Sequence, residues 1–230
     1  MEDTSVTFVV GNSRQIHELS EEETFLLDSH PRVFTINWFP VYWHFAGFRP
    51  THWAQMDCLD RHSVACFNYV LEVLKDDEIL ISRAKNYFVN SRDTARELEQ
   101  NLVASGIPFN RFTRGYYPEK NDGIGRSFSE KMLQCASSLV GAVNIAHVLF
   151  PETEIRLYGC ELAGSPGHFY DRAGDEVNIG QDYDVFTRRM WEGFGILLES
   201  GVRVFDCNKK HSSMIPECKK IPKKRLTEGF

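Results

Sequence analysis

An apolar strand that runs into a small-residue turn is the feature that most limits the fold of this chain. Val6–Val10 is followed at once by Gly11–Ser13, near the amino terminus. A second apolar segment, Ile155–Tyr158, also ends in a glycine, Gly159. Glycine and polar residues after buried strands are typical of the carboxyl edge of a parallel sheet, where α/β proteins bind nucleotides and phosphorylated ligands. The turn matches neither G-x-G-x-x-G nor a G-K-S/T triplet.

Strand and helix patterns alternate along the rest of the chain. Ser129–Leu149 has apolar residues at a 3.6-residue period, which predicts a helix packed on a sheet. Further strands are expected at Val33–Trp38, Met56–Asp60, Glu78–Ser82, Glu154–Tyr158 and Val202–Asp206. Further helices are expected at Ser63–Leu74, Ser91–Ser105 and Phe186–Ser200, a short helix or turn at Arg14–Leu19, and a loop at Pro108–Arg126. The alternation predicts an α/β fold: a Rossmann-like, mainly parallel sheet with helices on both faces, a three-layer sandwich.

Length and composition are those of an ordinary globular domain. With 230 residues, 42% of them hydrophobic and 25% charged, the chain is long enough for a large core and is not of the disordered class. We predict a single domain over residues 1–215, with a loop-rich insertion around 108–128. Residues 216–230 form a basic tail, although the net charge is −6, which excludes a general polyanion binder.

The sequence shows no pattern of a membrane-spanning segment or of a signal peptide. No apolar run reaches membrane-spanning length, and the amino terminus has no signal-peptide pattern. The six cysteines show no C-x-x-C spacing, which favours reduced thiols over a disulfide framework. We expect a cytoplasmic protein (in the host cytoplasm if it is viral) with no membrane partner. The oligomeric state is not indicated.

Two polar motifs follow the Ile155–Tyr158 strand. His168, in Gly-His-Phe-Tyr-Asp, would overhang the carboxyl edge, where an imidazole takes a proton from a hydroxyl at neutral pH. The alternative is a surface histidine packed on Phe169. Asp182-Tyr-Asp184 resembles a D-x-D motif for a divalent metal, but both carboxylates precede a helix, where aspartate is a good cap. We favour the cap, and therefore expect neither a metal site nor a cofactor.

The segment from Trp38 to Phe48 is unusually aromatic. Burial in a wall of the core is one interpretation, since such side chains usually bury area. The other is a platform on which Trp38 and Trp43 stack a sugar or a base of the acceptor. The basic residues Lys219–Arg225 carry a similar choice, between a solvated terminus and contacts with a phosphate backbone.

Five short motifs occur in a known order and approximate spacing. They are Val9–Ser13, Phe34–Asn37, the acid Asp57, the pair Ser137 and Ser138, and Leu157–Glu161. In this pattern the chain resembles the bacterial lipooligosaccharide sialyltransferases (glycosyltransferase family 42) and their relatives of the motility-accessory-factor type. The resemblance covers roughly residues 6–60 and 129–215.

The resemblance implies a donor site at the strand ends. The glycine turn and the asparagine of the second strand would hold the nucleotide, and a serine of the helix would face the sugar or phosphate. Glu161 would take the place of a strand-end aspartate, as a catalytic residue with His168. The donor-binding residues implied in this way are Gly11, Asn12, Ser13, Asn37, Asp57, Ser137, Ser138 and Gly159.

Two departures from the family pattern change the expected donor. Ser13-Arg14 stands where the family has Gly-Pro, and Ile179-Gly-Gln181 stands where the sialyltransferases carry a catalytic histidine. His168 is the nearest replacement for that histidine. A nucleotide sugar other than a sialic-acid donor is therefore at least as well supported.

The sequence predicts a nucleotide-sugar-dependent glycosyltransferase. The phosphate of the donor would lie against the amides of Gly11–Ser13, and His168 would deprotonate the acceptor hydroxyl. For the acceptor we slightly prefer a hydroxymethylated pyrimidine in DNA, of the kind found in phages, presented as a flipped base. The alternatives are a glycan acceptor and a non-catalytic nucleotide-binding module.

Overall fold

The computed structural model describes residues 4–56, 86–90, 110–114, 123–133, 135, 137–160, 183–208 and 215–216, together with seven single positions between 69 and 104. The strands are β1 (Val6–Val10), β2 (Val33–Ile36), β3 (His52–Gln55), β4 (Asn86–Asn90), β5 (Asn110–Arg114), β6 (Lys131–Met132), β7 (Glu154–Tyr158) and β8 (Val204–Asp206). The helices are the 3-10 helix η1 (Arg14–Glu18), α1 (Glu21–Ser29), α2 (Phe39–Ala46), α6 (Ser138–Leu149) and α7 (Tyr183–Glu199).

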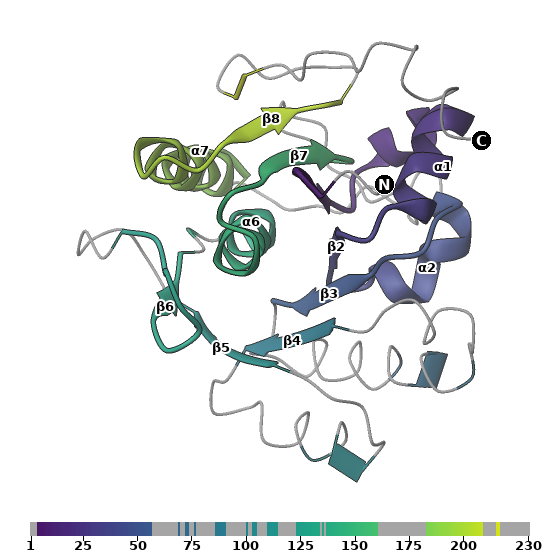
Figure 1. Ribbon diagram of the computed structural model, residues 1–230, viewed down its shortest axis with the longest axis horizontal. Coiled ribbons are helices and arrows are strands. Elements are labelled where there is room, and N and C mark those ends of the chain that lie inside the picture. Colours follow the sequence, from purple (N-terminus) through teal and green to yellow (C-terminus); the bar gives the residue numbers. More distant parts are fainter. Residues whose placement is uncertain are drawn as a thin grey trace.

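The strands form one sheet, in the order β6-β5-β4-β3-β2-β1-β7-β8, and every described pairing is parallel. Figure 1 shows α6 and α7 on one face of this sheet and α1 and α2 on the other. This arrangement confirms the predicted Rossmann-like three-layer sandwich.

Each face of the sheet has its own apolar core, because successive side chains of a strand point to opposite faces. In β1, Val9 belongs to the cluster under α6 and α7, together with Leu157 and Val143. Phe8 and Val10 belong to the cluster under α1 and α2. All five residues of β1 are buried, as expected of a central strand covered on both faces.

The chain reverses its direction of travel across the sheet beside β1. From β1 it moves outward through β2 to β6, and α6 then returns it to β7, on the other side of β1. The point between β1 and β7 is therefore a topological switch point, where open α/β sheets bind their ligands beyond the carboxyl ends of the strands. Gly11 and Gly159 both lie at this point.

Several predicted elements are confirmed. The strands Val6–Val10 and Glu154–Tyr158 have the predicted limits, and the predicted short helix after β1 is η1. Val33–Trp38 is shorter than predicted, because Asn37 leaves the strand with a left-handed φ of 47°. The last helix and the last strand are shifted from their predicted limits by at most three residues.

The aromatic segment from Trp38 to Phe48 contains a helix that the sequence did not predict. It forms α2, with Pro40 in the first turn and Gly47 as a left-handed C-cap (φ 76°), and Phe39 packs in the core. The third strand occupies His52–Gln55, before the predicted Met56–Asp60, of which the structure describes only Met56, outside the strand.

Two predicted elements before β7 also differ from the structure. β5 lies inside the stretch predicted as a loop, Pro108–Arg126. The helix predicted from Ser129 begins only at Ser138, because β6 and the left-handed Cys135 (φ 46°) precede it. The strand predicted at Glu78–Ser82 lies outside the described residues.

Candidate functional site

The turn after β1 is joined to the end of β7 by backbone contacts. Gly11 N donates to Tyr158 O at 2.9 Å, and Ser13 N donates to Gly159 O at 2.9 Å, which extends the β1–β7 pairing beyond the strands. A Cβ on Gly11 would lie 2.6 Å from Gly159 O, closer than real Cβ contacts allow. Gly159 itself has a left-handed φ of 58°. Both glycines are therefore required for two backbones to meet at the switch point.

These contacts change the expected role of the turn. Because the N–H groups of Gly11 and Ser13 donate to carbonyls, they are not available to cradle a phosphate. The Ser13 hydroxyl accepts from Gln15 N at 3.3 Å and caps η1. Among the described residues, the Asn12 N–H makes no hydrogen bond, and it is the one amide of the turn left for a ligand.

Asn37 connects three elements at the same edge of the sheet. Its Oδ1 accepts from Met56 N at 2.9 Å, next to β3, and its Nδ2 donates to Ser138 Oγ at 3.3 Å, at the start of α6. Its backbone O accepts from Trp53 Nε1 at 2.7 Å. Asn12 Nδ2 donates to Ile36 O, next to Asn37, at 3.4 Å. The structure thus brings Asn12, Asn37 and Ser138 together at one edge of the sheet.

The amino end of α6 lies at this edge as well. Ser137 caps the helix, with Oγ accepting from Val140 N at 3.5 Å, and the first turn contains no acidic residue. The first turn of α1, in contrast, carries Glu21–Glu23 and a capping box. The positive end of the α6 dipole therefore has no carboxylate of its own, which favours an anionic ligand there.

A second polar network fixes the end of β7. Asn208 Oδ1 accepts from Cys160 N and Asn208 Nδ2 donates to Cys160 O, both at 3.3 Å. Asp206, which is fully buried, accepts from Asn208 N and Nδ2 at 2.9 and 2.7 Å. Asn208 therefore sets the direction in which the chain leaves Cys160 toward Glu161. Sequence reasoning missed it, although Asp-x-Asn after a strand is a turn signal.

The thiols nearest the site are not suited to nucleophilic chemistry. Burial raises the pKa of Cys160 far above its ordinary value, and its Sγ donates to Tyr158 O at 3.1 Å. Burial also raises the pKa of Cys135 to about 11. Both thiols stay protonated near neutral pH, so neither supplies the thiolate that attacks substrates.

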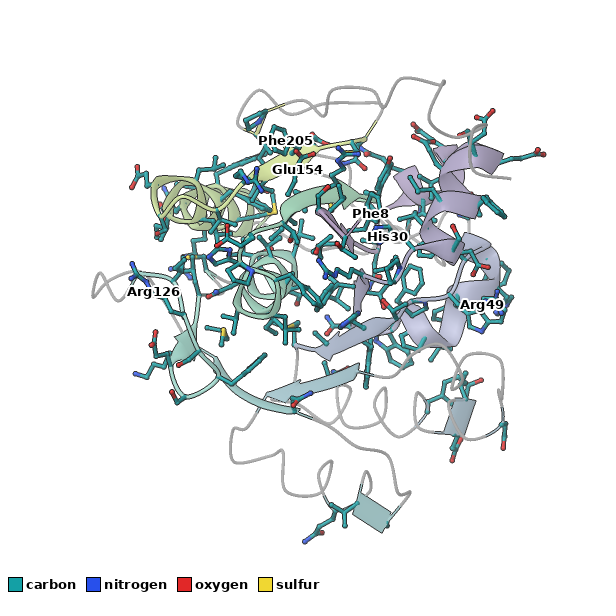
Figure 2. All side chains as sticks on the ribbon, in the orientation of Figure 1. Phe8, His30, Arg49, Arg126, Glu154 and Phe205 are labelled. Atoms are coloured by element: carbon teal, nitrogen blue, oxygen red, sulfur yellow. The ribbon has the colours of Figure 1, made fainter. Side chains whose placement is uncertain are left out.

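The two predicted acceptor-binding tryptophans lie at different ends of α2. Trp38 precedes the helix directly after Asn37, at the carboxyl edge. Trp43 lies 6.0 Å from the guanidinium of Arg49, which precedes β3 at its amino end and pairs with Asp28 at 2.6 Å. Figure 2 shows Arg49 beside α2. Trp43 therefore belongs to the opposite edge of the sheet from Asn37, and only Trp38 lies beside the site.

Several predicted site residues lie outside the described part of the chain. They are Asp57, which follows Met56, Glu161, which follows Cys160, and His168, Gln181 and Asp182. Asp184 is the second residue of α7, at the kind of helix start that the sequence suggested. Across the described residues, no group of three potential ligands is arranged to hold a metal ion. No described helix is long and apolar enough to cross a membrane.

Three buried polar atoms of the β1 turn and η1 have no hydrogen-bond partner among the described residues. They are Asn12 Oδ1, Arg14 Nη2 and Gln15 Oε1. Buried polar groups are nearly always paired, so unpaired atoms clustered in sequence at a switch point are candidates for contacts with a ligand. Sequence reasoning identified Asn12 but missed Arg14, whose only signal was the departure from Gly-Pro at Ser13-Arg14, and Gln15, which had no signal.

Comparison with known proteins supports the fold. No family model and no curated protein matches the chain. Among solved structures, the chain is similar to a MAf glycosyltransferase from Magnetospirillum magneticum AMB-1, with a TM-score of 0.55 and 13% sequence identity. The match covers 95% of this chain but only 34% of that protein. The resemblance drawn from short motifs is thereby confirmed as a likeness of fold.

Proposed function

We propose that this chain is a glycosyltransferase that uses a nucleotide-sugar donor. The observation that carries the proposal is the convergence of Asn12, Asn37 and Ser138 with the glycine turn at one switch point. These contacts come from β1, β2 and α6, which are distant in sequence. The fold likeness to a MAf glycosyltransferase supports the same conclusion.

In this proposal the donor lies across the carboxyl ends of β1, β2 and β7. Its phosphate faces the amino end of α6, whose dipole stabilises the charge that develops on the leaving nucleotide. His168 takes the proton of the acceptor hydroxyl. The acceptor oxygen then forms a bond to the anomeric carbon as the bond from that carbon to the phosphate oxygen breaks. The nucleotide leaves with the electron pair.

For the acceptor, the geometry favours a glycan hydroxyl over a modified base in DNA. The DNA alternative relied on the small size of the chain, on the basic tail and on the aromatic segment, and Trp43 of that segment lies beside Arg49 at the other edge. Trp38 alone remains beside the proposed donor. One aromatic ring is sufficient to stack a sugar.

A panel of nucleotide sugars tests the donor. UDP-, GDP-, ADP-, TDP- and CMP-linked sugars are incubated with the protein, and nucleotide release is measured with and without EDTA. We expect release from at least one donor, and its persistence in EDTA because the sequence favours helix-start residues over metal ligands at Asp182 and Asp184. Release from none of them, together with no binding by calorimetry, contradicts the proposal.

The catalytic base is tested separately. His168→Ala should lower turnover by about two to four orders of magnitude and leave donor affinity nearly unchanged, as expected on loss of a general base. His44→Ala is the matched control, since His44 is exposed on α2. Equal turnover in both variants removes His168 from the mechanism.

A further inference from the structure

Arg14 carries the one buried arginine nitrogen that lacks a partner among the described residues. Arg14 Nη2 has no hydrogen-bond acceptor, and Arg14 forms no ion pair in the described part of the chain. Other arginines are satisfied: Arg49 binds Asp28 at 2.6 Å and Arg156 binds Glu154 at 2.7 Å. Burial of an unpaired guanidinium nitrogen costs desolvation free energy, and a fold retains such a group where another interaction offsets that cost.

The position of Arg14 indicates what that compensation is. Arg14 is the first residue of η1 and directly follows the Ser13 cap, at the switch point between β1 and β7. On either side in sequence lie Asn12 Oδ1 and Gln15 Oε1, two unpaired oxygens, and Gln15 is only 9% exposed. A cationic donor flanked by neutral acceptors matches a ligand that has both an anionic group and hydroxyl groups.

The occupied amides of Gly11 and Ser13 also point to a side chain as the phosphate-binding group. Since Gly11 N and Ser13 N donate to Tyr158 O and Gly159 O, the backbone of this turn supplies little positive potential for a phosphate beyond that of the α6 amino end. A side chain of the turn can add to that potential, and a guanidinium pairs with phosphate oxygens in a bidentate geometry.

We propose that Arg14 binds a phosphate group of the nucleotide donor and that Asn12 and Gln15 accept hydrogen bonds from hydroxyls of the same ligand. The inference rests on the proposed function and adds to it a phosphate-binding residue and a class of ligand, a nucleoside phosphate. Arg14 is a binding residue in this scheme, with no part in proton transfer.

Thermal melting of Arg14→Met tests the inference. Met keeps much of the apolar length of the side chain but removes the charge. The free variant should melt at or above the wild-type temperature, because an unpaired buried charge has been removed. Inorganic pyrophosphate, UDP, GDP, ADP and CDP serve as ligands, and the corresponding uncharged nucleosides serve for comparison. At about 100 times Kd, a binding ligand should raise the wild-type melting temperature by roughly 5–10 °C.

Arg126→Met is the matched control. Arg126 is exposed and lies near β6, away from Phe8 in β1, as Figure 2 shows. We expect this variant to keep the full ligand-induced shift, whereas Arg14→Met loses it. Arg14→Lys should retain part of the shift, since it keeps the charge without the planar fork.

The outcomes separate this inference from the proposed function. A shift in Arg14→Met equal to that of the wild type overturns the role of Arg14, and donor turnover then stands without it. A clear fall in the melting temperature of the free variant assigns Arg14 to the fold and also overturns the inference. An Arg14-dependent shift with pyrophosphate, but no turnover of any nucleotide sugar, supports the phosphate site and contradicts the proposed function. No shift in the wild type with any phosphate overturns the site.

Discussion

Single residues at the switch point combine structural and functional demands. Asn37 leaves β2 with a left-handed φ of 47°, and this conformation aims its amide at both Met56 N and Ser138 Oγ. Asparagine tolerates that backbone conformation better than other residues with a side chain, apart from aspartate. The amide predicted to hold the donor therefore also fastens β3 and α6 to the end of β2.

A set of Asn37 variants separates the amide from the backbone conformation. Asn37→Ala loses both amide contacts and strains the backbone, so the free energy of unfolding should fall by about 1–3 kcal/mol for the buried N–H that it leaves unpaired, plus the strain. Asn37→Gly loses the same contacts without strain and should be the more stable of the two by about 1 kcal/mol. Urea denaturation measures both. Equal stability of Ala, Gly and wild type would remove the structural role.

Gly11 gives a prediction at the same scale. In Gly11→Ala the new methyl lies 2.6 Å from Gly159 O, and because neither backbone can yield freely the variant should lose about 1–3 kcal/mol. Gly195→Ala is the control, because nothing lies within 4 Å of its Cβ in α7. Higher helix propensity should stabilise that variant by up to about 1 kcal/mol. Denaturation of both variants checks the contrast, and equal effects would contradict close approach at Gly11.

His52 makes stability depend on pH. Burial, together with the charge of Arg32, lowers the pKa of His52 to about 3, while the ring stacks on Phe34 and bonds Thr51 Oγ1 at 2.8 Å. The unfolded side chain has a pKa of about 6.5, so between these values the unfolded state binds more protons. Stability should therefore fall as the pH drops below about 6.5, by up to about 1.4 kcal/mol per unit until the pH nears the folded pKa.

The variant His52→Asn removes this titration. Its stability should show a flatter slope between pH 6 and pH 4 than that of the wild type, whatever its absolute value. Burial also lowers the pKa of His147, which keeps some slope in both proteins. Denaturant midpoints over this range are the measurement, and parallel slopes would contradict the buried neutral state of His52.

At the scale of elements, α2 is the clearest case of a segment with two ends in different surroundings. The helix begins beside Asn37 at the carboxyl edge and runs toward Arg49 and Asp28 at the amino edge. An α-helix advances 1.5 Å per residue, so Trp43 lies about 7.5 Å along the axis from Trp38. Two aromatic residues that look equivalent in the sequence therefore face different surroundings.

This separation predicts different effects of the two substitutions. If the acceptor stacks on Trp38, Trp38→Ala should lower kcat/KM by the equivalent of about 1–3 kcal/mol. Trp43→Ala should leave kcat/KM within about a factor of two, since surface contacts away from a site contribute little, and should instead lower stability. Steady-state kinetics with the best donor of the panel decides, and the reverse order of effects would contradict the assignment of the edges.

At the scale of the whole molecule, the charge of the chain gives a test that separates a DNA acceptor from a glycan acceptor. The net charge is −6, and the basic residues Lys219–Arg225, outside the described part of the chain, are the best local source of phosphate contacts. If the acceptor is in DNA, the logarithm of the association constant should fall with the logarithm of salt concentration, by roughly 0.7–0.9 per phosphate contacted. Removal of Lys219–Arg225 should flatten this slope and leave donor hydrolysis intact.

Titrations of a fluorescent oligonucleotide at several salt concentrations make this measurement. Absence of DNA binding at low salt, together with sugar transfer to a small saccharide, would contradict the DNA acceptor and support the glycan. A steep slope that disappears with the basic residues would reverse the preference proposed above.

The sequence by itself determined the features that depend on local order. The apolar runs of β1 and β7 predicted both strands with their limits, and the glycines after them predicted an open carboxyl edge of the sheet, because backbone approach at a strand end leaves a local signature. The order of short motifs predicted the fold likeness. Of the predicted donor-binding residues, Gly11, Asn12, Ser13, Asn37, Ser138 and Gly159 meet at one edge.

Tertiary structure alone decided which polar groups of those residues are still available. The amides of Gly11 and Ser13 are occupied because β7 lies beside β1, and their partners Tyr158 and Gly159 are almost 150 residues away in the chain. No local sequence pattern predicts this pairing of β1 with β7. Arg14, whose sequence signal was a departure from a motif, is left at the switch point with a buried nitrogen that has no partner in the described part of the chain. Local patterns determine which strand ends are open, but long-range pairing determines which donors remain for a ligand.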